Sequence, residues 1–361
     1  MIKIRCSDLI ATLTSETIEA KLIGNDNTIQ SIQPIESCSP GVLTFAEKHQ
    51  YLITALQQQV AAVVVPENIG FDDLDLGETS LIQVSDVRVA LAYIRQHHDD
   101  NNPYQNKSPS QSEWVRIHPS AVIHKDVTVP DTAIIGPGVV IGSQVILAEH
   151  VVILANAVIE QRTRIGEHSI IHPCCVIGWG SEIGADVIIK AGAILGAEGH
   201  GFARDSAGQF HRIPQRGKVV IEDKVVIGAN CTIDRATYHE TRVHRGCIID
   251  AQCHLAHNVV LDEDCALVAQ TGIAGSSRLG KRVMASGQTG VLDHVNIPDD
   301  TVLVHRAGVI NSIKQSGMYA TTPPQPFARY LKNIAVFQRL AEVWERLRVL
   351  EKKVADLTDK H

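Results

Sequence analysis

Two histidines and one glycine of this chain have a spacing that suits acyl transfer. Gly275 follows His257 by eighteen residues, and His294 follows His257 by thirty-seven. If eighteen residues make one coil of a stacked structure, Gly275 lies directly against His257 and the histidines lie about 10 Å apart, at a strand spacing of about 4.8 Å. An imidazole can deprotonate a nucleophile, and a glycine N–H that no side chain covers can bind an oxyanion. Since the chain has seventeen histidines, solvent-facing positions without a catalytic role remain the alternative.

The element that would set this spacing is a six-residue repeat. From Ile117 to Leu195 every sixth residue is aliphatic, and the period resumes at Ile221 and again at Val243, continuing to Val309. A fixed hexapeptide period is typical of a parallel β-helix, in which three hexapeptides form one coil and the periodic aliphatic residues point inward. The sequence therefore predicts a mainly β fold with about nine to ten coils.

The repeat is interrupted twice, first by an inserted loop at 196–220 and then by a slip of four residues before Val243. Insertions in a solenoid emerge at its corners and often form its binding face. The first insertion is rich in Gly, His and Phe, which favours a functional role over the alternative that it is a surface loop without a function.

Different modules flank the repeat, which we place at 114–312. Residues 1–98 mix strand and helix patterns and predict an α/β domain, and the polar segment 99–113 reads as a linker. Residues 313–361 predict α-helices whose apolar residues have heptad spacing: Leu340, Val343, Leu347, Leu350, Val354 and Leu357. This extension is basic within an acidic chain, so it is either a solvated face or a docking surface for an acidic partner, with these candidates: Arg329, Lys332, Arg339 and Arg346.

Composition excludes several classes of protein. The formal net charge of −7 argues against nucleic acid as a partner. No apolar stretch is long enough to form a transmembrane segment, and the N-terminus does not resemble a signal peptide. The eight cysteines form no CxxC pair, so we expect buried thiols in a reducing cytoplasmic setting, with neither disulfides nor a metal site.

Several motifs resemble a known family, the UDP-3-O-(3-hydroxyacyl)glucosamine N-acyltransferases of lipid A biosynthesis. They are Ile213-Pro-Gln, Ile227-Gly-Ala, Thr232-Ile-Asp-Arg235, Ile249-Asp250 and Leu255-Ala-His-Asn258. The resemblance covers nearly the whole chain. It implies a left-handed parallel β-helix, an N-terminal uridine-binding domain and a homotrimer with sites between subunits. It also implies transfer of a (3R)-3-hydroxyacyl group from acyl carrier protein to the 2-amine of the UDP-sugar. No cofactor is expected beyond the 4'-phosphopantetheine of the carrier.

The resemblance also implies roles for individual residues. His257 matches the general base, Asp250 the acidic residue associated with it, and Gly275 the oxyanion donor. His294 matches a second histidine that contacts substrate or handles protons, and Asn258 matches a substrate-binding position.

Outside this cluster, the resemblance assigns two further sites. Phe45 and Tyr51 match an aromatic pair that holds uracil, with Lys48 between them as a substrate-binding candidate, although the family usually has Asn-Pro-Lys where this chain has Lys48-His49-Gln50. Gly308 and Ile310 stand where the family often carries methionines that line the acyl channel.

Two alternatives remain at this point. A trimeric hexapeptide carbonic anhydrase would bind zinc through three histidines, but the spacing of its ligands is not found in this chain. A catalytically altered paralogue that binds a sugar nucleotide or acts as a scaffold would keep the fold, and the departures at Lys48 and at Ala251, where Asn is usual, leave it open.

Overall fold

The computed structural model describes residues 3–98, 116–320 and 327–358. The chain forms two compact units, Met1–Asn106 and Lys107–His361. The segment predicted as a linker, 99–113, lies outside the described residues.

The first unit is an α/β domain, as the resemblance implied. Its five-stranded sheet has the order β2-β7-β6-β5-β4, in which only β2 is antiparallel to its neighbour. The strands are β1 (Ile4–Arg5), β2 (Ala20–Ile23), β3 (Thr28–Ile29), β4 (Ser31–Ile32), β5 (Val42–Phe45), β6 (Ala62–Pro66) and β7 (Ser80–Val84). The helices are α1 (Cys6–Ser15), α2 (His49–Gln57) and α3 (Val87–His98), with a short 3₁₀ turn, η1, at Ile35–Ser37.

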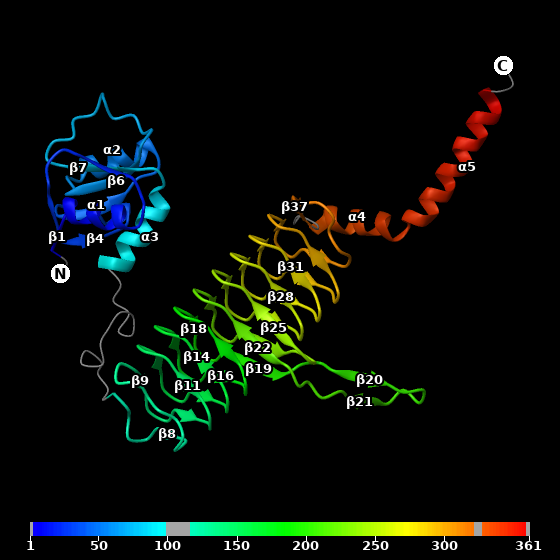
Figure 1. The fold of residues 1–361 in the computed structure, drawn as a ribbon. Coiled ribbons are helices and arrows are strands. Elements are labelled where there is room, and N and C mark those ends of the chain that lie inside the picture. The colour runs from blue at the N-terminus through cyan, green and yellow to red at the C-terminus, as the bar shows by residue number, and fades with distance from the viewer. Residues whose placement is uncertain (1–2, 99–115, 321–326, 359–361) are drawn as a thin grey trace. The chain divides into compact units, whose positions relative to one another are not determined.

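The second unit contains a parallel β-helix with three sheets, and Figure 1 shows its stacked coils. The β8 sheet has ten strands: β8 (Val122–Ile123), β10 (Val140–Ile141), β13 (Val158–Ile159), β16 (Val176–Ile177), β19 (Ile194–Glu198), β24 (Thr232–Arg235), β27 (His254–Leu255), β30 (Gly272–Ile273), β33 (Gly290–Val291) and β36 (Gly308–Val309).

The β9 sheet also has ten strands: β9 (Ile134–Ile135), β12 (Val152–Ile153), β15 (Ile170–Ile171), β18 (Ile188–Ile189), β23 (Val226–Ile227), β26 (Ile248–Ile249), β29 (Ala266–Leu267), β32 (Met284–Ala285), β35 (Val302–Leu303) and β37 (Met318–Tyr319). The β11 sheet has eight: β11 (Ile146–Leu147), β14 (Arg164–Ile165), β17 (Glu182–Ile183), β22 (Lys218–Ile221), β25 (Glu240–Val243), β28 (Val260–Leu261), β31 (Arg278–Leu279) and β34 (Asn296–Ile297).

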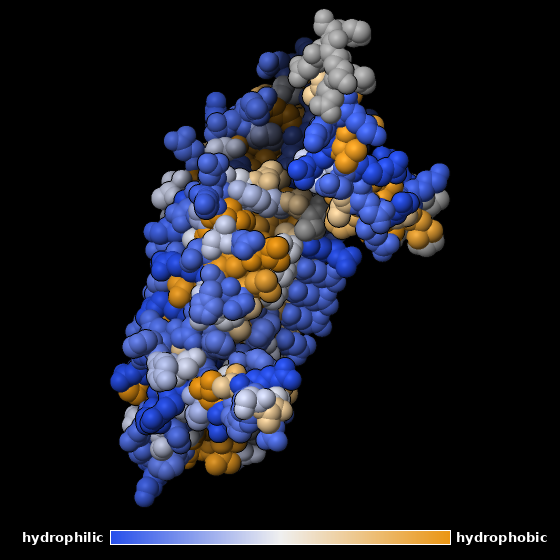
Figure 2. All heavy atoms as spheres, turned by 90° about the vertical axis from the view of Figure 1, so that its right-hand side faces the viewer, coloured by the Kyte–Doolittle hydropathy of each residue, from blue (hydrophilic) through white to orange (hydrophobic). Residues whose placement is uncertain are grey.

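The six-residue repeat produces this architecture because its aliphatic residues fill a single continuous core. Ile141 pairs with Ile159 in the next coil, eighteen residues on, and both are buried. The predicted buried thiols Cys247, Cys253 and Cys265 lie in the same core. The fold class and the mainly β content predicted from the repeat are confirmed. The face shown in Figure 2 is mostly hydrophilic, with apolar side chains gathered in limited patches.

The first interruption of the repeat is a hairpin that leaves the β-helix (Figure 1). β19 continues to Glu198, β20 (Phe202–Arg204) pairs with β21 (Phe210–Arg212), and the chain rejoins the β11 sheet at Lys218. The buried Arg235 guanidinium holds both ends of this insertion: Nε donates to the Gly196 carbonyl at 2.8 Å, and Nη1 donates to the Gly217 carbonyl at 3.2 Å. A charged side chain is stabilised in the interior when such acceptors surround it.

The described chain ends in two helices, α4 (Phe327–Gln338) and α5 (Leu340–Thr358). The predicted heptad residues Leu340, Val343, Leu347, Leu350 and Val354 are all exposed within this chain, from 46 to 59%; the side chain of Leu357 lies outside the described residues. Among the helices that the structure describes, none is long and apolar enough to cross a membrane.

Glycines after the inward aliphatic residue allow neighbouring corners to approach closely. A Cβ on Gly166 would lie 2.5 Å from the backbone carbonyl carbon of Gly184, whereas a Cβ on Gly287 would lie no closer than 3.4 Å to any atom. We therefore expect Gly166→Ala to destabilise the β-helix by about 1–3 kcal/mol, the usual cost of overpacking. Denaturant unfolding measures this, with Gly287→Ala as the matched control. Equal stability of the two variants would contradict this account of the corner.

Candidate active site

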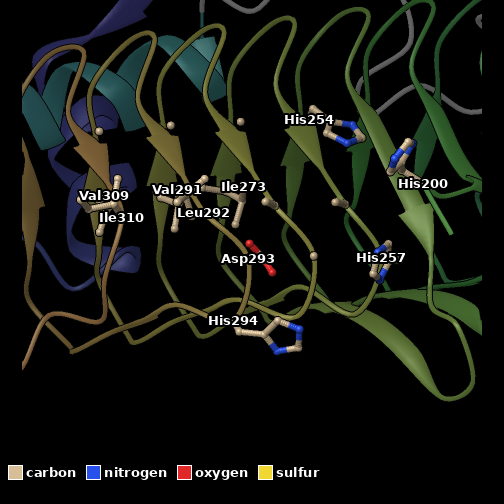
Figure 3. Close-up of a pocket in the computed structure, with 16 residues that line it drawn as sticks. His200, His254, His257, Ile273, Val291, Leu292, Asp293, His294, Val309 and Ile310 are labelled. Atoms are coloured by element: carbon tan, nitrogen blue, oxygen red, sulfur yellow. The ribbon is translucent and has the colours of Figure 1, made fainter. Parts of the chain in front are cut away.

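A groove of about 750 Å³ runs along the β8 sheet and its following corner. Figure 3 shows His200, His254 and His257 at one end, and Val309 and Ile310 at the other. Strands β27, β30, β33 and β36 form its floor, so four successive coils contribute to it. The insertion contributes His200, which explains why Gly and His are concentrated there.

The predicted stacking of Gly275 on His257 is confirmed. A Cβ on Gly275 would lie 2.6 Å from Cε1 and 2.8 Å from Nε2 of His257, so the imidazole occupies the space above the glycine. Ser276 N donates to the His257 carbonyl at 2.9 Å, and His294 N donates to the Gly275 carbonyl at 3.0 Å. The three coils are thus held in register, and any side chain at position 275 would displace the His257 ring.

Hydrogen bonds to Asn258 determine which nitrogen of His257 is free. The backbone N–H of Thr237 donates to Asn258 Oδ1 at 3.1 Å, which identifies this atom as the amide oxygen because a backbone N–H can only donate. His257 Nδ1 lies 3.1 Å from the same oxygen and must therefore carry the proton. In the neutral imidazole Nε2 is then the unprotonated nitrogen, and it lies over Gly275 together with Cε1.

The backbone N–H of Gly275 is a free donor. Gly275 is the first of the two turn residues at its corner, a position whose N–H has no partner in the ladder between coils. At other corners an acidic side chain accepts this N–H, as Glu160 does from Trp179 at 2.8 Å and Asp299 from Lys281 at 2.9 Å. Among the described residues, no group accepts the Gly275 N–H. The fold therefore offers an anion-binding donor next to Nε2.

Stacked glycines form the floor of the remaining groove. Gly272, Gly290 and Gly308 are register partners in successive coils, and a Cβ on any of them would meet no atom within 4 Å. Leu292 and Ile310 are exposed apolar side chains beside this floor. The result is an apolar trough that suits an alkyl chain. The predicted acyl-channel residues Gly308 and Ile310 lie at its far end (Figure 3).

His294 and Asp250 differ in where they lie relative to His257. His294 is exposed at the groove edge two coils from His257, beside Asp293 (Figure 3). Asp250 lies at another corner, after β26 of the β9 sheet, where its carboxylate accepts N–H groups from Ala251 at 2.7 Å and Ala269 at 3.2 Å. Asp250 therefore does not line the groove with His257 in this chain.

The structure adds a carboxylate to the site that the sequence analysis did not select. Asp234 lies on β24, is only 7% exposed, and its Oδ2 lies 3.6 Å from Nε2 of His254. Burial raises the pKa of this carboxyl, and electrostatic attraction to His254 and His257 opposes that rise when those side chains are protonated. His254 Nδ1 also lies 2.7 Å from the Thr232 hydroxyl. Asp234 stands in the Thr-Ile-Asp-Arg motif, but the sequence does not show that the insertion folds over it.

The predicted uridine residues lie together at one edge of the N-terminal sheet. Phe45 ends β5, Lys48 is the N-cap residue of α2, and the half-exposed Tyr51 is in the first turn of that helix. The carboxyl ends of parallel strands and the following helix N-termini are the usual place for nucleotides in such sheets. A salt bridge of 2.7 Å between Arg88 and Glu47 lies beside them.

The predicted docking residues are all exposed: Arg329 and Lys332 lie on α4, Arg346 lies on α5, and Arg339 is the turn residue between the two helices. Arg339 Nε lies 2.9 Å from Glu342 on the next helix, so part of its charge is already neutralised. No group of three or more His, Cys, Asp or Glu side chains able to hold a metal occurs in residues 3–98, 116–320 and 327–358.

Comparison with known proteins places the chain in a family. Residues 117–200 match the family model described as the GMPPB C-terminal domain. The UDP-3-O-acylglucosamine N-acyltransferase of Methylococcus capsulatus is 53% identical over 97% of this chain and 98% of its own length. That of Pseudomonas savastanoi is 34% identical over 95% of both chains.

Solved structures resemble a smaller part of the chain. The UDP-N-acetylglucosamine O-acyltransferase of Moraxella catarrhalis is 24% identical and covers 58% of this chain and 72% of its own, with a TM-score of 0.45. The two relatives described above match at higher identity and over nearly their whole lengths. The chain therefore belongs to the UDP-3-O-acylglucosamine N-acyltransferase family, whose members are acyltransferases.

Proposed function

We propose that this protein transfers a 3-hydroxyacyl group from the thioester of acyl carrier protein to the 2-amine of UDP-3-O-acylglucosamine. The observation that carries this proposal is the arrangement of His257 and Gly275, in which an imidazole with a free nitrogen lies over a glycine whose backbone N–H has no acceptor among the described residues. The family supplies the acceptor, because its members are named for it. An apolar trough leads away from the same point, as acyl transfer requires.

In this mechanism His257 Nε2 takes a proton from the acceptor nitrogen as the nitrogen attacks the thioester carbonyl carbon. The Gly275 N–H donates to the oxyanion of the tetrahedral intermediate, and preorganised donors of this kind act most strongly in the transition state. Collapse of the intermediate breaks the C–S bond, and His257 returns the proton to the thiolate. His294, at the same edge, contacts the sugar or assists the proton transfer.

The other predicted sites complete the proposal. Phe45 and Tyr51 hold the uracil ring, and Lys48 contacts the same nucleotide. The exposed basic residues of the C-terminal helices dock the acidic carrier protein: Arg329, Lys332, Arg339 and Arg346. The uncovered heptad residues of α5 support a homotrimer, because an apolar seam of this kind is buried by association with other helices. Across such an interface Asp250 would approach His257.

His257→Ala tests the central assignment. We expect the variant to lose about 10²–10⁴-fold in turnover, the usual contribution of a general base. Turnover is measured with UDP-3-O-acylglucosamine and 3-hydroxyacyl carrier protein, and thermal unfolding checks the fold. His305→Ala, at the same turn position of a corner outside the groove, should keep its activity. A His257 variant that retains more than about a tenth of the wild-type rate would show that another group is the base.

Asn258→Gly tests how the imidazole is oriented. The backbone of Asn258 has φ 63°, a conformation that glycine adopts readily, so the substitution removes the amide without straining the turn. Loss of the acceptor for Nδ1–H should lower kcat by at least about tenfold through misorientation of His257. Asn156→Gly, at φ 60° in a distant corner, is the matched control. If both variants keep full kcat, Asn258 does not orient the base.

Gly308→Met tests the acyl trough. Gly308 lies three coils from His254, roughly 14 Å at the strand spacing. This length accommodates about eleven carbons of an extended alkyl chain, because C–C bonds of about 1.5 Å advance only about 1.25 Å each along the zigzag. A methionine there should therefore lower kcat/KM for donors longer than that while leaving shorter acyl chains nearly unaffected. A panel of acyl carrier proteins with different chain lengths measures the shift, with Gly287→Met as control. An unchanged length preference would place the acyl chain elsewhere.

A further inference from the structure

A buried carboxylate beside His254, which lines the groove, lacks a strong partner. Asp234 is 7% exposed, and in the described parts of the chain no N–H or O–H group donates a hydrogen bond to it. The nearest basic atom is His254 Nε2, at 3.6 Å from Oδ2, beyond good hydrogen-bonding distance. Ionised carboxylates are rarely buried without donors because their desolvation is costly.

Asp234 lies beside the proposed base. A Cβ on Gly199 would be 3.1 Å from Asp234 Oδ2 and also 3.1 Å from His257 Cβ, so these two atoms lie within twice that distance of each other. The insertion passes over both residues, and its next residue, His200, lines the groove. The carboxylate therefore lies under the insertion, close to His257 and directly behind the groove-lining His254.

The other charged groups around Asp234 have their own partners. The Arg235 guanidinium binds the Gly196 and Gly217 carbonyls, and Glu198 forms a bidentate ion pair with Arg212 at 2.8 Å. Burial raises the pKa of Asp234, while His254 and His257 lower it. A carboxyl whose pKa is shifted by burial beside a cleft, with histidines as its charged neighbours, is typical of a group whose partner arrives with the substrate.

We propose, on the basis of the N-acyl transfer proposed above, that Asp234 binds the acceptor amine and selects it over a hydroxyl. A neutral primary amine has two N–H groups: one donates to Asp234 while the other gives its proton to His257 Nε2. A hydroxyl has a single proton and cannot serve both acceptors, so a buried carboxylate is left without a donor when a hydroxyl occupies the site. Sites built to bind one polar group discriminate strongly against an analogue that leaves them unpaired.

The reaction balances with these assignments. The nitrogen lone pair attacks the thioester carbonyl carbon, the C–N bond forms, and the proton facing His257 leaves the nitrogen. The C–S bond then breaks, and the thiolate takes that proton from His257. The proton held by Asp234 stays on nitrogen and becomes the N–H of the product amide, so the carboxylate is ionised before and after the reaction.

Asp234→Asn tests this inference with two acceptors, UDP-3-O-acylglucosamine and its analogue with a hydroxyl in place of the 2-amine. We expect the KM for the amine to rise by about tenfold or more, as for a lost hydrogen bond to a charged group. The ratio of kcat/KM for amine over hydroxyl should fall by at least the same factor, and the KM for the acyl carrier protein should not change. Asp186→Asn, an exposed aspartate at the corner after β17 that does not line the groove, removes the same charge and should leave all three values unchanged.

Thermal unfolding verifies that the variant is folded, and Asp234→Ser replaces it if the asparagine variant does not fold. A lower kcat with an unchanged amine KM and an unchanged ratio would mean that Asp234 acts only through His257, and would overturn the inference. The inference would also be overturned if His254→Gln caused the same loss of amine selectivity as Asp234→Asn. In that case Asp234 would act only through its ion pair with His254. If the wild-type protein does not acylate the amine at all, the proposed function is wrong. If the wild-type protein acylates the amine and Asp234→Asn has the same KM and the same amine selectivity, only this inference is wrong.

Discussion

The eighteen-residue coil is the constraint on which the rest of this structure depends. Inward aliphatic residues such as Ile141 and Ile159 fill a core one side chain wide, and that core tolerates no slip because a shift of one residue would turn the aliphatic residues outward. The register of every corner follows from it. Side chains eighteen residues apart therefore lie in contact, and the chain can assemble a site from residues of several coils without any loop holding them together.

The candidate site uses a backbone N–H group that the hydrogen bonds between coils leave without an acceptor. The first turn residue of a corner has a backbone N–H that the ladder between coils does not use, and carboxylates such as Glu160 and Asp299 accept it at corners outside the groove. At Gly275 the N–H stays free and an imidazole covers the glycine instead. The same structural position is thus capped by an acidic side chain at some corners and, in the proposed mechanism, by an oxyanion at this one.

The insertion adds what a regular β-helix cannot provide, namely a cover. Arg235 holds both ends of the insertion through hydrogen bonds to the Gly196 and Gly217 carbonyls. Gly199, which follows β19, lies over Asp234 and over the Cβ atom of His257. The resulting burial changes the chemistry of Asp234, since the same carboxylate on an open face would be hydrated and indifferent to the nature of the acceptor. The insertion therefore buries the carboxylate of Asp234, whereas the regular coils of the β-helix form the groove.

The sequence by itself determined the architecture and the central pair of the site. Strict periodicity predicts the coil, and the coil length places Gly275 on His257, because in a solenoid distance along the chain converts directly into distance in space. Only the tertiary structure decided the orientation of that imidazole, through the Thr237 N–H that identifies the Asn258 oxygen. It also showed that Asp250 caps a different corner and that Asp234 is buried beside His257. These features depend on how a non-repeating insertion folds over the coils and on where individual hydrogen bonds go, and neither is encoded in a six-residue period.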